Sequence, residues 1–196
     1  MPPVNPDDAG HAEVRARILD TACRLFYARG VRAVGVDLIV AEAGVAKTSL
    51  YRHFGTKDDL VAAFLKREDE DFWSHWDGVR DAHPGDALGE LKAQLDWIGE
   101  RVARADYRGC PQINVAAEFP EREHPARKVA AAHKRALRDR LAEIAQGLGV
   151  ARPDELAGQL SLLINGGFVS ADALKPGEAT AMLQAAARSL IEAGRR

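Results

Sequence analysis

Apolar residues recur at helical spacing along most of the chain and predict helices that end at glycine or proline. The first apolar stripe consists of Val14, Ile18, Ala22, Leu25 and Phe26. It stops before Gly30, and a glycine just past the last apolar position is a common helix end. The same rule ends two short helices at Gly44 and Gly55. The pattern thus predicts one helix that ends at Gly30, a second over 36–43 and a third over 46–54.

Longer helices follow, separated by clusters of turn-forming residues. These clusters lie at 83–85, 107–111, 147–149 and 175–177. The predicted helices run over 57–81, 86–105, 126–148, 153–173 and 178–193, and a short apolar segment occupies 112–119. Apart from the ambiguous stretch 31–36, no segment shows the period-two alternation of a strand. The sequence therefore predicts an all-α fold of about nine helices.

The chain divides by pattern into a leader and two helical domains. Residues 1–10 contain three prolines and no apolar period, which is typical of a disordered leader. Residues 11–56 are expected to form a small domain of three helices, and residues 57–196 a larger helical domain.

The helix within VAKTSLYRHFGTKDDL, residues 45–60, is short, and it is polar where a core helix would be aliphatic. With the preceding helix and the turn at Gly44 it has the outline of a helix-turn-helix, whose second helix enters a DNA major groove about 12 Å wide. Its leading turn carries Lys47, Thr48 and Ser49, which are small or polar enough to approach base edges. The alternative is a plain helical hairpin inside a bundle.

Neighbouring residues have the chemistry to bind the DNA backbone. Tyr51 and His53 are expected on the outward side, where they can donate to phosphate oxygens. Thr56, as N-cap, and Lys57 add a hydroxyl, a cation and backbone amides where the next helix begins. The complete set of predicted DNA-binding residues is Gly35, Lys47, Thr48, Ser49, Tyr51, Arg52, His53, Thr56 and Lys57.

The stretch GVRAVGVDLIVAEAGVAKTSLYRHFGTKDDL, residues 30–60, resembles the N-terminal part of TetR-type transcriptional repressors. The likeness is carried above all by Ala43-Gly44-Val45, Leu50-Tyr51, His53-Phe54 and Lys57-Asp58-Asp59-Leu60. It implies an N-terminal three-helix DNA-binding domain and a larger C-terminal helical domain that binds a ligand and dimerises. The threonine usual near the start of the family's second helix is Gly35 here, which can cap through its backbone but lacks the hydroxyl that often contacts phosphate.

A single recognition helix covers only a few base pairs, so useful affinity requires two copies at a fixed separation. We expect a homodimer on a palindromic double-stranded DNA operator, formed as in the family through helices 153–173 and 178–193 as an isologous four-helix bundle. The apolar stripes of these helices are Leu156, Leu160, Leu163, Ile164 and Gly167, and Met182, Leu183, Ala186, Leu190 and Ile191. The alternative is that the stripes cover the core of their own domain.

Aromatic and polar residues of the middle helices have the composition of a cavity for an apolar or aromatic small-molecule effector. The predicted ligand-binding residues are Trp73, Trp76, Trp97, Tyr107, Cys110, Ile113, Asn114, Phe119 and His133. Tryptophans at helical spacing also occur as ordinary core residues. In the mechanism that the resemblance implies, the ligand moves the helix that begins at Lys57, changes the separation of the two recognition helices and releases a repressor from its operator.

Charge is distributed unevenly, although the formal net charge is only -2. Residues 11–57 contain eight Lys or Arg against four Asp or Glu, whereas residues 58–77 contain two against seven. A basic first quarter suits a surface that meets phosphates. Because the sequence has no apolar run of roughly 20 residues and no secretory leader, we expect a cytoplasmic protein without a membrane segment.

An enzyme is the main alternative class. Cys110 with His124 or His133 has the atoms of a nucleophile and base, and a redox-sensing thiol at Cys110 is an intermediate alternative. Neither histidine has an evident orienting partner, the histidine spacings fit no zinc motif, and no phosphate-binding glycine loop occurs. We therefore predict no catalytic residue, no metal and no cofactor. A DNA-binding dimer that senses no ligand stays open as a third alternative.

Overall fold

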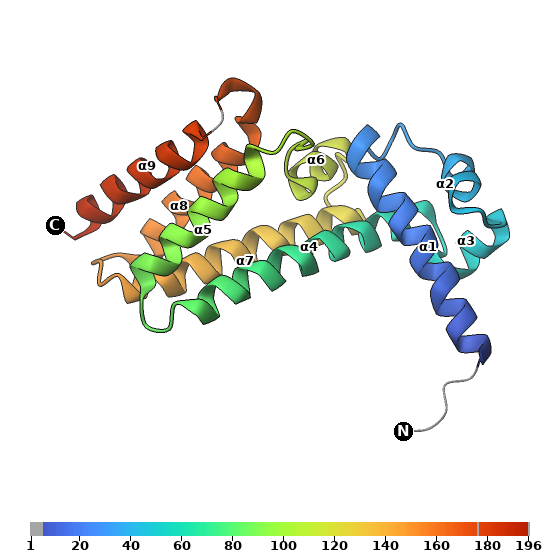
Figure 1. Ribbon diagram of the computed structural model, residues 1–196, viewed down its shortest axis with the longest axis horizontal. Helices are drawn as coiled ribbons and strands as arrows, with labels where there is room; N and C mark the ends of the chain where they lie inside the picture. The colour runs from blue at the N-terminus through green and yellow to red at the C-terminus, as the bar shows by residue number, and fades with distance from the viewer. Residues whose placement is uncertain (1–5, 176, 196) are drawn as a thin grey trace. The chain divides into compact units, whose positions relative to one another are not determined.

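The computed structural model describes residues 6–175 and 177–195, and it is helical throughout (Figure 1). The elements are α1 Pro6–Arg29, α2 Val36–Ala43, α3 Lys47–Phe54, α4 Lys57–Ala82, α5 Ala87–Val102, α6 Pro111–Glu118, α7 Pro125–Gly147, α8 Pro153–Val169, the 3-10 turn η1 Ala171–Ala173, and α9 Glu178–Gly194. Within these described ranges there are nine α-helices and no strand, which confirms the all-α prediction. None of these helices combines the length and the apolar character that crossing a bilayer requires.

Three predicted boundaries differ from the observed ones by more than one residue. Helix α1 begins at Pro6, so residues 6–10 of the predicted disordered leader are helical, while residues 1–5 lie outside the described ranges. A helix can start on proline because its first turn leaves the backbone N–H unbonded anyway. Helix α5 ends at Val102, before the predicted 105. Helix α8 ends at Val169, and the predicted stretch to 173 continues as the 3-10 turn η1 after Ser170, whose hydroxyl donates to the carbonyl of Gly166.

The chain packs as two compact units, which are described separately below. Unit 1 contains the described residues up to 69 together with 111–130, and unit 2 contains 70–110 together with 131–195. This division by packing differs from the predicted domains 11–56 and 57–196. The reason is that the first turns of α4, from Leu60 to Leu65, are buried in the core of unit 1, together with Val115 of α6.

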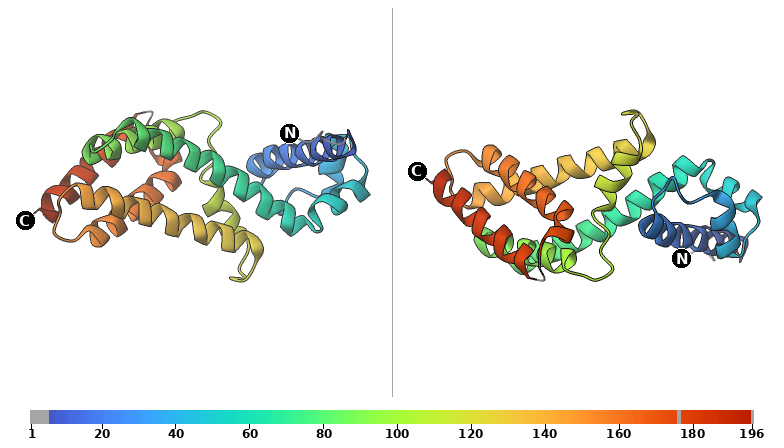
Figure 2. Two further views of the ribbon diagram at one scale, coloured as in Figure 1. Left: turned by 90° about the horizontal axis from the view of Figure 1, so that it is seen from below. Right: turned by 90° about the horizontal axis from the view of Figure 1, so that it is seen from above.

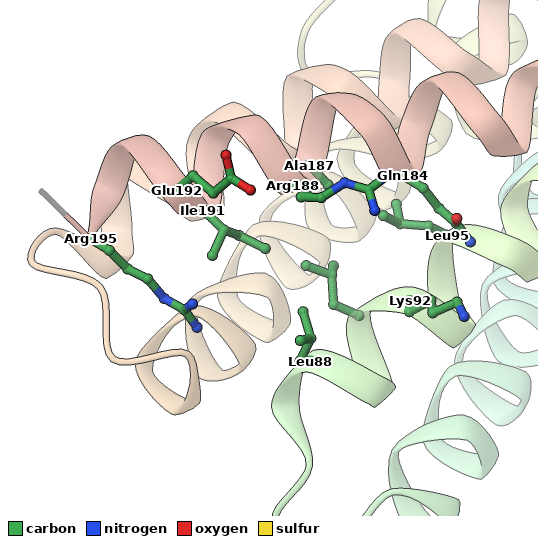
Figure 3. A pocket seen from close by; sticks show the side chains of 10 residues that line it. Leu88, Lys92, Leu95, Gln184, Ala187, Arg188, Ile191, Glu192 and Arg195 are labelled. Carbon is green, nitrogen blue, oxygen red and sulfur yellow. The ribbon is translucent and has the colours of Figure 1, made fainter.

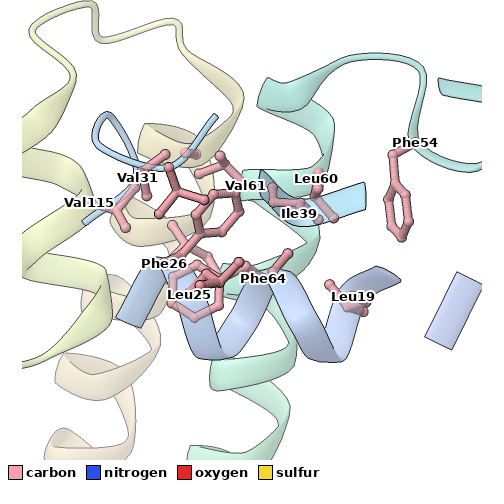
Figure 4. Packing of buried hydrophobic residues seen from close by; sticks show 14 of the residues in the cluster. Leu19, Leu25, Phe26, Val31, Ile39, Phe54, Leu60, Val61, Phe64 and Val115 are labelled. Atoms are coloured by element: carbon pink, nitrogen blue, oxygen red, sulfur yellow. The ribbon is translucent and has the colours of Figure 1, made fainter. Parts of the chain in front are cut away.

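The core of unit 1 is one apolar cluster, on which the short helices α2, α3 and α6 pack (Figure 4). It joins α1, α2, α3, the start of α4, α6 and the start of α7. Phe26 and Phe64 meet at its centre with their ring centroids 5.8 Å apart. Leu50 and Phe54, the two apolar residues of α3, are buried as the sequence predicted. Each such buried side chain contributes roughly 1.5–3 kcal/mol relative to an exposed one.

Glycines in the left-handed region end the two short helices. Gly44 follows α2 with φ 63, and Gly55 follows α3 with φ 70. A side chain with a Cβ is strained in this region, whereas glycine adopts it readily. The predicted helix ends at Gly44 and Gly55 are confirmed, and the turn at Gly44 sets α3 at a sharp angle to α2 (Figure 1).

The start of α4 has a reciprocal cap. The backbone N–H of Asp59 donates to Thr56 Oγ1 at 3.1 Å, and the Thr56 N–H and hydroxyl both donate to Asp59 Oδ2. This is the capping-box arrangement with an aspartate in place of the usual glutamate. It confirms Thr56 as the N-cap of α4.

A carboxylate from α6 connects to the turn after α1. Glu118 accepts hydrogen bonds from the backbone N–H of Val31 at 3.0 Å and of Arg32 at 2.7 Å. Lys57 Nζ, at the start of α4, donates to the carbonyl of the same Val31 at 2.7 Å. Hydrogen bonds at Val31 and Arg32 therefore connect the turn after α1 with the end of α6 and the start of α4. The sequence analysis did not identify this connection.

In unit 2, helices α5, α8 and α9 pack along one another (Figure 2). Gly99 of α5 is buried against Thr180 of α9, where a Cβ would lie only 2.8 Å from the Thr180 Cα. Gly147 makes a similar approach to Ala87, at 2.7 Å between the added Cβ and the Ala87 Cβ. Small residues thus set the separation of these helices.

The apolar stripes of α8 and α9 mostly cover the core of their own unit. The stripe residues buried within the chain are Leu156, Leu160, Ile164, Gly167, Leu183 and Ile191. For these residues the alternative of an intrachain core describes the structure better than the predicted dimer interface, because they face α5 and each other's helix. On α8 and α9 the large apolar residues left exposed are Leu162 at 76%, Val169 at 66% and Met182 at 52%.

We predict that Gly99→Ala lowers the free energy of unfolding by about 1–3 kcal/mol, because the added methyl group overpacks the contact between α5 and α9. Gly78→Ala is the matched control, since Gly78 lies inside α4 with nothing within 4 Å of the added Cβ. There the higher helix propensity of alanine should stabilise by up to about 1 kcal/mol. Chemical denaturation measures both changes, and equal effects at the two positions would contradict the close-packing argument.

Candidate nucleic-acid interface

Helix α3 presents a polar outer face on an apolar inner one. Lys47, Thr48 and Arg52 are exposed, and the Tyr51 side chain is 43% exposed. The N-cap residue Ala46 makes no side-chain cap, so the first backbone N–H groups of the helix point outward without a side-chain acceptor from that residue. A helix N-terminus of this kind attracts anions, including phosphate.

Lys47 has an acidic partner on the neighbouring helix. Its Nζ lies 2.7 Å from Asp37 Oδ1 of α2, with both side chains largely in solvent. The hydrogen bond and the negative charge of Asp37 raise the pKa of Lys47 above its ordinary value, so this cation is fully charged at neutral pH. Because the pair is exposed, a phosphate group can compete with Asp37 for the ammonium at small cost.

Gly35 occupies the N-cap of α2 in an extended conformation, φ -79 and ψ 155, with no side-chain cap. Nothing lies within 4 Å of a Cβ added there. Neither backbone nor packing therefore requires glycine at this position.

His53 and Lys57 face inward, not outward as the sequence predicted for His53. The His53 ring packs edge-on against His11 with centroids 5.6 Å apart, and its Nε2 is buried without a hydrogen-bond partner among the described residues. Burial lowers the pKa of His53, and the charges of Arg52, His11 and Arg15 lower it further, so the ring is neutral at pH 7. The Lys57 ammonium donates a hydrogen bond to the Val31 carbonyl, and burial lowers the pKa of Lys57 as well.

The predicted DNA-binding residues therefore separate into those exposed on the outer surface of α3 and those already engaged in contacts within the chain. Lys47, Thr48, Tyr51 and Arg52 share the outer surface of α3, and Ser49 is half-buried beside them. The hydroxyl of Thr56 is used within its capping box. Sequence reasoning missed Asp37 as the partner of Lys47, because an acid in the first turn of a helix is ordinarily explained by the helix dipole alone.

In unit 2 four of the predicted ligand-binding aromatics form one cluster. Trp73, Trp76 and His133 surround the ring of Phe72, with centroid separations of 4.9–5.9 Å. Trp97 of α5 lies 5.0 Å from Phe72 and stacks on the exposed ring of His75 at 4.1 Å. We call Phe72, Trp73, Trp76, Trp97 and His133 the aromatic cluster.

A buried amide lies beside the aromatic cluster. Gln94 of α5 donates through Nε2 to the Trp76 carbonyl at 2.9 Å. Its Oε1 is buried with no hydrogen-bond partner within the part of the chain that the structure describes. An orphan acceptor of this kind costs free energy unless water or a bound donor satisfies it.

The remaining predicted ligand-binding residues are divided between the units. In unit 2, the Tyr107 hydroxyl donates to the Phe168 carbonyl at 3.0 Å, and buried Cys110 lies 3.8 Å from Lys134 Nζ. In unit 1, Phe119 stacks on His124 at 3.8 Å between ring centroids. The two others, Ile113 and Asn114, belong to α6, also in unit 1. The nine residues thus do not form one group within a single unit.

Lys134 is the most unusual polar residue of unit 2. It contacts Asn165 Oδ1 at 2.5 Å as well as Cys110, and burial lowers its pKa below the ordinary value. The thiol of Cys110 itself is buried, so the exposure that a reactive cysteine ordinarily has is absent here. Among the described residues no group of three or more potential metal ligands comes together.

Comparison with known proteins agrees with this geometry. The profile of the family described as "Bacterial regulatory proteins, tetR family" matches residues 18–64, which span α2, α3 and their flanks. The HTH-type transcriptional repressor Rv3405c of Mycobacterium tuberculosis is 34% identical over 111 residues, which are 57% of this chain and 56% of that protein. The chain therefore spans about half the length of the curated relatives it matches. These relatives are named as transcriptional regulators and not as enzymes.

Solved structures extend the likeness over nearly the whole chain. SCO4454 of Streptomyces coelicolor, a TetR-family transcriptional regulator, superposes with a TM-score of 0.88 and 30% identity, covering 94% of this chain and 97% of that one. The regulator sav143 of Streptomyces avermitilis has a TM-score of 0.77 at 29% identity, covering 92% and 97%. With sequence and fold matched over almost its full length, this protein belongs to the TetR family of bacterial regulatory proteins.

Proposed function

We propose that the protein is a dimeric, sequence-specific DNA-binding repressor that leaves a palindromic operator when a small apolar or aromatic effector binds. The observation that carries this proposal is the exposed polar face of α3, held rigidly by a buried apolar face on the core of unit 1. Such a helix is built to enter a major groove. A protein acting on an operator works in the cytoplasm, where bacterial DNA lies.

The residues of that face divide by role. Thr48 and Lys47, in the first turn, are placed to reach base edges, while Tyr51 and Arg52 extend toward the flanking phosphates. Repression is supported by the names of two relatives, Rv3405c and KstR2 of Rhodococcus jostii, the latter 40% identical over 65 residues. A third, FasR of Mycolicibacterium smegmatis, is named as an activator, so the sign of regulation requires a reporter assay.

Dimerisation through α8 and α9 is supported by the surface that these helices leave open. Leu162, Val169 and Met182 are exposed large apolar residues on the two helices. Gly158 and Gly166 of α8 have nothing within 4 Å of an added Cβ inside the chain. Each interior glycine costs about 1 kcal/mol of helix stability relative to alanine, and close approach of the same helices of a second copy would offset that cost.

Effector binding is supported by the aromatic cluster and by the orphan Oε1 of Gln94, which together offer apolar walls and one hydrogen-bond acceptor. Helix α4 begins at Lys57 in unit 1 and carries Phe72, Trp73 and Trp76 in unit 2. A ligand that moves this helix would alter the spacing of the two recognition helices and weaken operator binding by a coupling free energy of about 1–3 kcal/mol.

Selection from random duplex DNA tests the proposal directly. We expect enrichment of a palindrome whose half-sites are about one helical turn or slightly more apart. On that site Lys47→Ala should weaken binding by about 1–3 kcal/mol and relax the sequence preference at the base pair that Lys47 contacts. Lys128→Ala, which removes an exposed cation of unit 1 paired with Glu123, is the control and should leave affinity unchanged. If both variants lose the same operator affinity, the loss reflects only the change in net charge, which would contradict the proposed interface.

The double variant Leu162→Asp with Met182→Asp should convert a dimer into monomers, because two buried carboxylates per chain would disrupt an apolar interface. Light scattering after size exclusion gives the mass. The control is Leu88→Asp, since Leu88 is as exposed as Met182 but belongs to α5 and not to either proposed interface helix. A dimer that survives the double variant would place the interface elsewhere.

A charge at Trp97, introduced as Trp97→Glu, should reduce the response to apolar aromatic compounds while operator binding stays mostly intact, because the charge enters only the aromatic cluster. Trp97→Phe is the conservative control. Operator release is followed by fluorescence anisotropy across a compound library. Equal loss of operator binding and ligand response by a folded variant would count against separate sites for DNA and effector.

A further inference from the structure

A groove of about 400 Å³ runs between α5 and α9 on the surface of unit 2 (Figure 3). Its floor is apolar and consists of Leu91, Leu95, Ala187 and Ile191, with Leu88 at one end. Leu88 is 56% exposed, whereas the four floor residues are only 1–5% exposed, so Leu88 supplies most of the open apolar surface. The groove uses none of the residues assigned above to DNA, to the aromatic cluster or to the exposed surface of α8 and α9.

Cations gather along the rim of this groove. Lys92 stands on the α5 side, and Arg188 extends along α9 toward Gln184 (Figure 3). Arg195 lies just after the end of α9, where its Nη2 is 3.5 Å from the Leu148 carbonyl. Glu192 is the one acidic residue of the lining, so three cations outnumber it.

We propose that this groove binds an amphipathic monoanion, a medium-chain alkyl carboxylate. The volume falls in the range of small-molecule sites, which is too small for a folded partner to fill. An alkyl chain would cover exposed Leu88 and lie along the narrow apolar floor beside it. The carboxylate would meet the planar guanidinium of Arg188, which can bind it through two parallel N–H donors. Charge complementarity therefore selects a carboxylate over an alcohol or a cationic amphiphile of the same length.

The groove stays accessible if α9 also forms a dimer contact. Helix geometry places Met182 about 120° around α9 from Arg188, because the two residues are six positions apart at 3.6 residues per turn. Gln184, Ala187 and Ile191 follow the Arg188 side. One helix can therefore contact a second copy on one face and a ligand on another.

The test is calorimetric titration of the full-length protein with decanoate below its micelle concentration. We expect saturable binding of one decanoate per chain, weaker binding of octanoate by a few-fold for each methylene removed, and at least tenfold weaker binding of decanol and of decyltrimethylammonium. The absence of saturable decanoate binding, or equal affinity for the carboxylate and the cation, would overturn the proposal.

Variants locate the site. Arg188→Gln should weaken decanoate at least tenfold without changing the affinity for decanol, and Leu88→Asp should weaken both. Arg138→Gln, at an exposed arginine of α7 outside the groove, is the matched control and should bind decanoate normally. If Trp97→Glu lowers decanoate affinity while Arg188→Gln does not, the ligand occupies the aromatic cluster and the groove proposal is wrong. If Arg188→Gln or Leu88→Asp changes the oligomeric mass, the groove is an interface between copies, which overturns it as well.

Discussion

The burial of Leu50 and Phe54 in the core of unit 1 is the contact on which the DNA-reading surface depends. Helix α3 has eight residues, far fewer than the roughly 12–15 that an isolated helix needs to be even marginally stable in water. Its order comes from tertiary packing, while Gly44 ends the preceding helix and Gly55 ends α3 itself. A polar helix can therefore stand at the surface with its outer side chains unused by the fold.

The same core determines which polar groups stay available for DNA. His53 and Lys57 are drawn inward, one against His11 and the other onto the Val31 carbonyl, and burial lowers the pKa of each. Glu118 occupies the two backbone N–H groups next to that carbonyl. These contacts hold together the core on which α3 packs. Fewer polar side chains therefore remain on the outer surface of α3 to contact DNA.

In unit 2 the separation of helices decides which surfaces remain open. Gly99 lets α9 approach α5 closely, which buries Leu183 and Ile191 inside the chain. Other faces of α8 and α9 are left with exposed apolar residues or with the cationic groove beside α5. An interior face, a proposed dimer face and a proposed anion site thus coexist on α9 because its side chains point in different directions around one axis.

The sequence by itself determined the helices, most of their ends, the apolar inner face of α3 and the cap at Thr56, because these follow from residues within a few positions of one another. It did not determine the fate of individual polar and apolar side chains. Glu118 meets Val31 across 87 positions, Lys57 reaches the Val31 carbonyl across 26, and the stripes of α8 and α9 turn mostly into their own core. Tertiary structure alone decided these contacts, since a helical period shows that a residue lies on an apolar face but not which neighbour that face meets.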